Sequence, residues 1–163
     1  MERNTTVNAM EPDTSVKAMD RDASVKVMER DTSVKVFVSA ILHDGKGRVL
    51  MARRGGAARD RHGQWEFGGG SLEAGETLEA ALVRETREEL GVELTDMRQL
   101  YAHDFVRDSG TWIGIFYVCR VDPADVSIVE PVYDELGWFV PEALPEPTFE
   151  IAHELVALAK PYL

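Results

Sequence analysis

The sequence predicts an α/β protein in which a mixed β-sheet lies between helices, an α/β/α sandwich. Apolar stretches of strand-like character recur along most of the chain, separated by turns rich in glycine, proline and aspartate. Two stretches have apolar residues at helical spacing instead, Thr77–Leu90 in the middle and Phe149–Lys160 at the end. Strands mixed with helices in this way favour a sheet that is covered on both faces.

A hairpin begins the predicted sheet. Val34–His43 is an apolar run long enough for a full strand, and Asp44–Gly47, with the sequence Asp-Gly-Lys-Gly, is typical of a tight turn. Val49–Arg53 is the returning strand of this hairpin. A polar loop at Gly55–Gly63 then leads to a short strand at Trp65–Phe67.

The first predicted helix follows the glycine run Gly68–Gly70. It covers Thr77–Leu90 and ends at Gly91, because glycine readily takes the left-handed conformation that follows many helices. One side of this helix is apolar or small, and the residues that form it are Leu78, Ala81, Leu82 and Thr86.

Two long strands come next, at about Met97–Val106 and Thr111–Val121, joined by a turn at Asp108–Gly110. Leu136–Val140 is the last predicted strand. A proline-rich connection leads from it to the closing helix, Phe149–Lys160. The apolar face of the closing helix is expected to consist of Ile151, Leu155 and Leu158.

Size and composition point to a single domain. The chain has 163 residues, of which 44% are hydrophobic, and no apolar run is long enough to span a bilayer. Its N-terminus lacks the apolar core of a secretory signal. Cys119 is the only cysteine, so no intrachain disulfide is expected, and we interpret this residue as a small buried hydrophobe. We therefore expect a cytoplasmic protein with no membrane partner.

The charge balance limits the partners. A formal net charge of −11 repels a polyanionic backbone, so we expect no stable binding to a nucleic acid polymer. Small anionic substrates remain compatible with this charge, because a bound divalent cation reverses the local field.

An internal repeat precedes the first strand. Its four similar nonapeptides are Thr5–Asp13, Thr14–Asp22, Ala23–Asp31 and Thr32–Ala40. If the third copy took the place of the fourth in the first strand, Phe37, Val38 and Ile41 would be looped out. Burial of each of these side chains stabilises the fold by roughly 1.5–3 kcal/mol. The chain thus divides into an extension over residues 1–31 and a domain over residues 32–163. We interpret the spare copies as a mobile tail, an added edge strand or an intersubunit contact. The last of these interpretations would make the protein a homodimer.

The stretch Gly70–Val92 carries the chemistry. In a helix, Glu85, Glu88 and Glu89 stand at positions i, i+3 and i+4, so their carboxylates emerge on one face. Like charges this close repel one another unless a hard divalent cation accepts their oxygens, and magnesium is such a cation. A solvated charged helix would explain two adjacent glutamates, but not the whole spaced pattern with its preceding glycines.

Two further residues of this stretch fit the same interpretation. Glu76 and Arg84 lie about two helical turns apart, so they are expected to pair across the junction between loop and helix and to fix the frame that holds Glu85. The glycines before the helix let the backbone turn sharply beside the carboxylates and expose carbonyl oxygens to a cation.

Gly70–Val92 resembles the Nudix box, GX5EX7REUXEEXGU, in which U is a bulky aliphatic residue. Every charged and glycine position matches. Thr86 departs from the pattern at the first U position, and Gly68 stands where many members have proline. The similarity extends from about Val34 to Pro145. It implies a Nudix-type α/β/α sandwich.

The resemblance also implies a site. Glu85, Glu88 and Glu89, together with the Gly69 carbonyl, would bind Mg²⁺, or alternatively Mn²⁺. Glu85 would also deprotonate or orient the attacking water and would itself be oriented by Arg84. Some members take the base from a later loop, and the candidates here are Glu135 first and Glu130 second.

Substrate contacts are expected at the end of the second strand. Arg53 and Arg54 belong to the basic cluster of the domain, which continues with Arg59 and Arg61, and arginine suits phosphate recognition. Arg54 has the stronger claim, because related proteins place contacts at this point. The aromatic residues Trp65, Phe105, Tyr117 and Trp138 are able to stack on a base, although strand aromatics more often belong to the core.

The resemblance implies an enzyme that hydrolyses a diphosphate linkage in a small phosphorylated nucleotide. The markers of ADP-ribose and dinucleoside polyphosphate hydrolases are missing, so a nucleoside triphosphate cut to monophosphate and pyrophosphate is the first expectation. An ADP-ribose or nucleotide-sugar hydrolase is the alternative among enzymes. An alternative of another class is a ligand sensor that keeps the fold without catalysis, although such proteins usually lose a box carboxylate.

Overall fold

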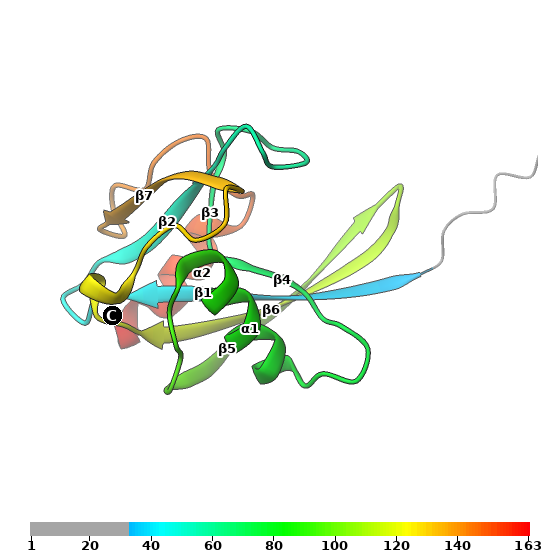
Figure 1. Ribbon diagram of the computed structural model, residues 1–163, viewed down its shortest axis with the longest axis horizontal. Helices are drawn as coiled ribbons and strands as arrows, with labels where there is room; N and C mark the ends of the chain where they lie inside the picture. The colour runs from blue at the N-terminus through cyan, green and yellow to red at the C-terminus, as the bar shows by residue number, and fades with distance from the viewer. Residues whose placement is uncertain (1–32) are drawn as a thin grey trace, which may run out of the picture.

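The computed structural model describes residues 33–163, and Figure 1 shows how their elements are arranged. The strands are β1 (Val34–His43), β2 (Val49–Arg54), β3 (Trp65–Glu66), β4 (Gly69–Ser71), β5 (Met97–Arg107), β6 (Gly110–Arg120) and β7 (Tyr133–Phe139). The helices are α1 (Leu78–Leu90), α2 (Ala152–Ala159) and the 3-10 turns η1 (Pro123–Asp125) and η2 (Lys160–Tyr162). None of the helices in this part of the chain is long and apolar enough to cross a membrane.

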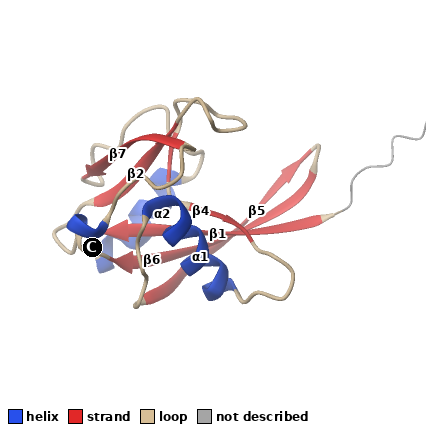
Figure 2. Cartoon of the chain, in the orientation of Figure 1, coloured by secondary structure: helices blue, strands red, loops and turns tan. Residues whose placement is uncertain are grey.

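The strands form one mixed sheet that divides into two parts. Its order is β3-β2-β1-β6-β5, with β4 paired to β1 and β7 paired to β2. β1 and β6 run parallel, and the other pairs are antiparallel. β1 and β2 are in register only at His43 and Val49, so β2, β3 and β7 separate from β1, β4, β6 and β5 beyond this point (Figure 2). The glycine segment of β4 lies in this division.

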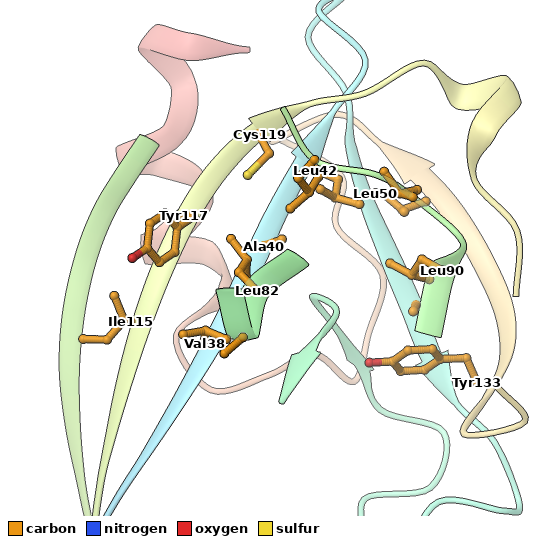
Figure 3. Close-up of a cluster of buried hydrophobic side chains, with 14 residues drawn as sticks. Val38, Ala40, Leu42, Leu50, Leu82, Leu90, Ile115, Tyr117, Cys119 and Tyr133 are labelled. Carbon is orange, nitrogen blue, oxygen red and sulfur yellow. The ribbon is translucent and has the colours of Figure 1, made fainter. Parts of the chain in front are cut away.

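The two helices cover opposite faces of the sheet. Alternate residues of β1 point to opposite sides, and the side of Val38, Ala40 and Leu42 packs against Leu82 and Leu90 of α1 (Figure 3). The other side packs against α2, in a cluster that includes Ile41, Met51, Phe116, Leu155 and Val156. This arrangement is the predicted α/β/α sandwich.

Capping residues set the ends of α1. The Thr77 side chain accepts a hydrogen bond of 3.1 Å from the Ala80 N–H, which satisfies a donor of the first turn. Gly91 has φ 70°, a left-handed conformation that favours glycine, and its N–H donates to the Arg87 carbonyl. The predicted limits of this helix are confirmed, and so is the burial of Ala81, Leu82 and Thr86.

Several sequence predictions at the other elements need correction. Gly69–Ser71 is a short strand and not only a turn, because it pairs with β1. β7 begins at Tyr133 and not at Leu136, since its first residues pair with the end of β2. The closing helix begins at Ala152, and Leu158, expected on its apolar face, is 41% exposed.

The division of the chain into residues 1–31 and 32–163 stays a prediction. β1 begins at Val34, inside the fourth nonapeptide. The predicted extension over residues 1–31 lies outside the described residues. Cys119 is buried, as expected.

Candidate functional site

A glycine turn held against α1 forms the floor of the candidate site. β4 pairs antiparallel with β1, which places Ser39 opposite Gly69 and Val38 opposite Gly70. A Cβ atom on Gly70 would lie 2.3 Å from the carboxyl carbon of Glu85, so this carboxylate rests directly on the glycine backbone. At Gly69 a Cβ atom would lie 2.1 Å from the Val38 carbonyl oxygen. Only glycine permits these approaches.

Arg84 connects the carboxylates around this turn. Its Nε and Nη2 atoms donate to Glu76 at 2.8 and 2.9 Å, and its Nη1 donates to Glu85 at 2.8 Å. The Ser71 carbonyl accepts a further bond of 3.1 Å, and Glu88 lies at 3.4 Å. The hydrogen bonds from Arg84 lower the pKa of Glu76 to about 2. The predicted pair of Glu76 and Arg84 is therefore present, and it fixes one Glu85 oxygen.

Glu89 occupies the opposite, interior side of the turn. It is 8% exposed, and its Oε2 accepts hydrogen bonds from the Gly69 N–H at 2.8 Å and the Tyr133 hydroxyl at 3.3 Å. Burial raises the pKa of the Glu89 carboxyl to about 8, the Gly69 bond opposes this rise, and the charges of Glu85 and Glu66 add to it. Burial also raises the pKa of Glu85, against the effect of Arg84.

The three glutamates of α1 that were predicted to bind a cation therefore differ in their surroundings. The Glu85 and Glu88 side chains are 16% and 45% exposed, and Glu89 is buried. Within residues 33–163 no three acidic, histidine or cysteine side chains are already grouped as a metal site. The donor set still fits a hard divalent cation, because carboxylate oxygens lie beside a glycine turn that leaves no space for a Cβ atom.

A cleft of about 630 Å³ opens beside the glycine turn. Gly69 and Gly70 belong to its lining, together with charged residues from the neighbouring part of the sheet. Arg54 is held there by Glu66, with Nη1 and Oε1 2.6 Å apart, and Arg61 approaches the same carboxylate at 3.4 Å. Cationic side chains in a cleft that also includes the glycine turn beneath Glu85 are suited to bind phosphate oxygens.

Another part of the cleft lining is aromatic. Four phenylalanines in this lining have ring centroids 5.7 to 6.3 Å apart, and we call them the aromatic group: Phe37, Phe105, Phe116 and Phe149. The side chains of Arg107 and Glu150 form an ion pair in the same lining. Flat apolar rings beside a polar pair suit a heteroaromatic base. Of the aromatic residues considered from the sequence, Phe105 is buried but borders the cleft, whereas Tyr117 is buried in the apolar cluster under α1.

The structure separates some of the residues predicted for the site. Arg53 does not line the cleft, because its side chain forms ion pairs of 2.8 Å with Asp134 and Glu135. The Glu135 carboxylate is thus paired with an arginine of β2, away from α1. The second candidate base, Glu130, lies nearer to α1, since the N–H of the preceding residue Val129 donates to the Glu89 carbonyl at 2.9 Å.

Two residues of the site had no role in the sequence interpretation. Glu66 is 8% exposed between two buried aromatic residues of the sequence, and a charged residue in such an apolar strand is itself a signal of a special environment. Tyr133 is 3% exposed, and its hydroxyl lies between two glutamates. No sequence signal marks Tyr133, because its partners come from distant parts of the chain.

Comparisons with known proteins find curated relatives that are similar to part of this chain. A curated CTP pyrophosphohydrolase from Escherichia coli (strain K12) is 44% identical over 66 residues, which are 40% of this chain and 48% of that protein. An NAD-capped RNA hydrolase from Chromobacterium violaceum is 30% identical over 116 residues, which are 66% of this chain and 43% of that protein. The chain thus spans less than half the length of these two relatives.

A solved structure agrees with the fold. The MutT NUDIX hydrolase from Burkholderia pseudomallei has a TM-score of 0.70 at 26% identity, over 77% of this chain and 98% of that one. The family model described as the NUDIX domain matches residues 34–159, a range that contains both helices, all seven strands and the glycine turn. The resemblance predicted from the Gly70–Val92 stretch is thereby confirmed, and the chain belongs to the NUDIX domain family.

Proposed function

We propose that the chain hydrolyses a diphosphate linkage in a nucleotide with the help of a divalent cation, Mg²⁺ in the first place and Mn²⁺ as an alternative. The preferred substrate is a nucleoside triphosphate, which would yield a monophosphate and pyrophosphate. The observation that carries this proposal is the Glu85 carboxylate, fixed by Arg84 on the Gly70 backbone beside a cleft with cationic and aromatic walls.

Each residue has a distinct task in the proposed reaction. Glu85, Glu88 and Glu89, with the Gly69 carbonyl, would hold the cation, which when bound lowers the pKa of water and stabilises charge on phosphoryl oxygens. Glu85 would accept or orient the proton of the attacking water. The 2.8 Å bond from Arg84 leaves one oxygen of that carboxylate fixed and so restricts its rotation. Glu130 is the alternative base.

The cleft would bind the two chemically different halves of the substrate. Arg54 and Arg61 would contact phosphate oxygens, and the aromatic group would stack on the base. The Arg107–Glu150 pair offers a donor and an acceptor for the edge of that base. A small nucleotide is favoured over a nucleic acid polymer because the net charge is −11.

One relative favours a second substrate class. The similarity to an NAD-capped RNA hydrolase extends over 66% of this chain, and its printed substrate contains a nucleotide cap instead of a free triphosphate. A substituted nucleoside diphosphate, such as ADP-ribose or a nucleotide sugar, is therefore the second candidate. The two candidates differ in their products, since only the triphosphate yields inorganic pyrophosphate.

The test is hydrolysis of a nucleotide panel with Mg²⁺ in oxygen-18 water. We expect pyrophosphate and a monophosphate from a nucleoside triphosphate, with the label in one of them. Glu85→Gln is expected to lower turnover by about 10²–10⁴, the usual contribution of a positioned acid–base group, and to keep the fold. Turnover equal to that of the wild type in this variant would contradict the role of Glu85, and a wild type inactive on every panel member would point to a ligand sensor.

A further inference from the structure

Tyr133 lies between two buried carboxylates that come from separate elements. Its hydroxyl is 3.3 Å from Glu89 Oε2 on α1 and 3.4 Å from Glu66 Oε1 on β3. The ring belongs to the apolar cluster under α1, at the edge of that cluster in Figure 3. The hydroxyl is thus the polar tip of a core side chain and is directed at the candidate site.

The sheet fixes this position. Tyr133 is the first residue of β7 and pairs with Arg54 of β2, at a register shift between Arg53 and Arg54. Arg54 itself is bonded to Glu66, 2.6 Å away. A continuous chain of contacts therefore runs from the wall of the cleft, through Glu66 and the Tyr133 hydroxyl, to Glu89.

The chemistry of the bridge is asymmetric. A hydroxyl has one proton, so it donates to one carboxylate at a time, while an ionised carboxylate, the form that binds a cation, only accepts. Glu66 also has the Arg54 guanidinium as a donor, but Glu89 has only the Gly69 N–H besides Tyr133 among its hydrogen-bond donors in the described residues. Both bonds to Glu89 are accepted by Oε2, so together they fix the rotation of that carboxylate.

We propose that Tyr133 is a positioning residue whose hydroxyl orients Glu89 for cation binding and couples it to the Arg54–Glu66 pair in the cleft wall. The inference rests on the proposed function, because it assigns Glu89 to a cation. Residues that hydrogen-bond a metal-ligating carboxylate typically change metal affinity or activity by about 10–100-fold when they are mutated. The ring contributes packing, and the hydroxyl contributes the orientation.

Tyr133→Phe separates these two contributions, since it keeps the ring. A matched control is Tyr117→Phe. Tyr117 is 1% exposed in the same apolar cluster, and its hydroxyl lies 3.3 Å from Glu79, also on α1 but outside the glycine turn. Each variant loses one buried hydroxyl near a glutamate of α1, so a purely structural effect should be similar in both.

The measurement is the affinity for Mn²⁺ of the full chain without nucleotide, followed by electron paramagnetic resonance. We expect about tenfold or greater weakening for Tyr133→Phe and less than a twofold change for Tyr117→Phe, with similar melting temperatures. Equal Mn²⁺ affinity in the wild type and Tyr133→Phe would overturn the inference. Equal weakening in both variants would overturn it as well, because a general loss of packing would then be the cause.

A second variant tests the coupling. Glu66→Gln keeps the shape of Glu66 and removes its charge. Together with Tyr133→Phe and the double variant, it completes a double-mutant cycle. If Tyr133 connects the two carboxylates, the effects on Mn²⁺ affinity are not additive. Additive effects would contradict the coupling. Because these readouts need no nucleotide, a wild type that hydrolyses nothing would refute the proposed function while leaving the role of Tyr133 supported by its Mn²⁺ result.

Discussion

Arg84 is the residue on which the geometry of the candidate site depends most. Its guanidinium contacts Glu76 through two atoms and Glu85 through a third. A planar group with donors in fixed directions is able to hold both carboxylates at once. The arginine of the family pattern thus has a structural explanation, since a point charge at this position would not fix two partners.

Arg84→Lys is expected to lower kcat by about 10–100-fold, the usual loss when a residue that orients a metal ligand is changed. An ammonium group retains the charge but not the two-sided contact. The control is Arg87→Lys, because Arg87 is 57% exposed and lies 3.7 Å from its partner Glu93. Steady-state kinetics would check this expectation, and equal kcat values for the two variants would contradict it.

Asp44 carries a pH dependence that is independent of the site. Burial would raise the pKa of Asp44, but hydrogen bonds from the Arg48 side chain and from the Lys46 and Arg48 N–H groups together lower it. The folded protein thus favours the charged form. This stabilisation is present above the pKa of Asp44 in the unfolded chain and is lost as the pH falls through its lowered pKa in the folded protein.

Asp44→Asn is therefore expected to destabilise the protein at pH 7 by about 1.5–3 kcal/mol, the range for hydrogen bonds to a charged group. At about pH 2 the difference from the wild type should shrink, because Asp44 then approaches its neutral form. Urea unfolding at both pH values measures the difference in free energy of unfolding between the wild type and Asp44→Asn. A difference that stays constant between the two pH values would show that charge is not the cause.

At the scale of elements, the sequence predicted what depends on local pattern. The prediction of α1 followed from an apolar period and a final glycine, both within one stretch, and the structure adds the Thr77 cap. β4 could not be predicted in this way, because Gly69 and Gly70 have no side chains to alternate and become a strand only by pairing with β1. The type of most elements could thus be predicted from local sequence, whereas the pairing of β4 with β1 depends on tertiary contacts.

The start of α2 shows the same limit. Phe149 and Glu150 continue a helical pattern in the sequence, but the structure uses them outside the helix, where both line the cleft. The carboxylates of the site were predictable because one helix carries them. Tyr133 was not, since it joins the site through β7 from a distant sequence position. Glu66 had a signal in its charge within an apolar strand, but the sequence did not show its partners.

The glycine turn gives a sharp test at this scale. Gly70→Ala would place a methyl group 2.3 Å from the Glu85 carboxyl carbon, so that side chain must move. We expect kcat to fall by about 10–100-fold, as for other changes that misplace a metal ligand. Gly56→Ala is the control, because a Cβ atom there meets no atom within 4 Å. A Gly70→Ala enzyme with full activity would refute the close contact.

At the scale of the whole molecule, the division of the sheet creates the site. The part with β2, β3 and β7 supplies Arg54 and Glu66. The part with β1, β4, β5 and β6 supplies the glycine turn and three rings of the aromatic group, and Phe149 joins them from the segment before α2. α1 adds the carboxylates from one face. Substrate and cation would therefore meet where the two parts of the sheet separate.

Removal of residues 1–27, so that the chain begins at Met28, is expected to leave hydrolysis nearly unchanged. β1 starts at Val34, and among the described residues, 33–163, those that line the cleft begin at Phe37. The comparison requires kcat/KM of the full and shortened chains on the same nucleotide, together with their oligomeric state. A large loss of activity in the shortened chain would mean that the repeat segment contributes to the site.

The central claim is that α1 and the glycine turn hold a divalent cation, and anomalous diffraction from crystals grown with Mn²⁺ tests it most directly. The account predicts an anomalous peak within bonding distance of carboxylate oxygens of Glu85, Glu88 and Glu89, next to Gly69. At saturating Mn²⁺, a peak elsewhere, or none at α1 while the three side chains keep their separate surroundings, would contradict it.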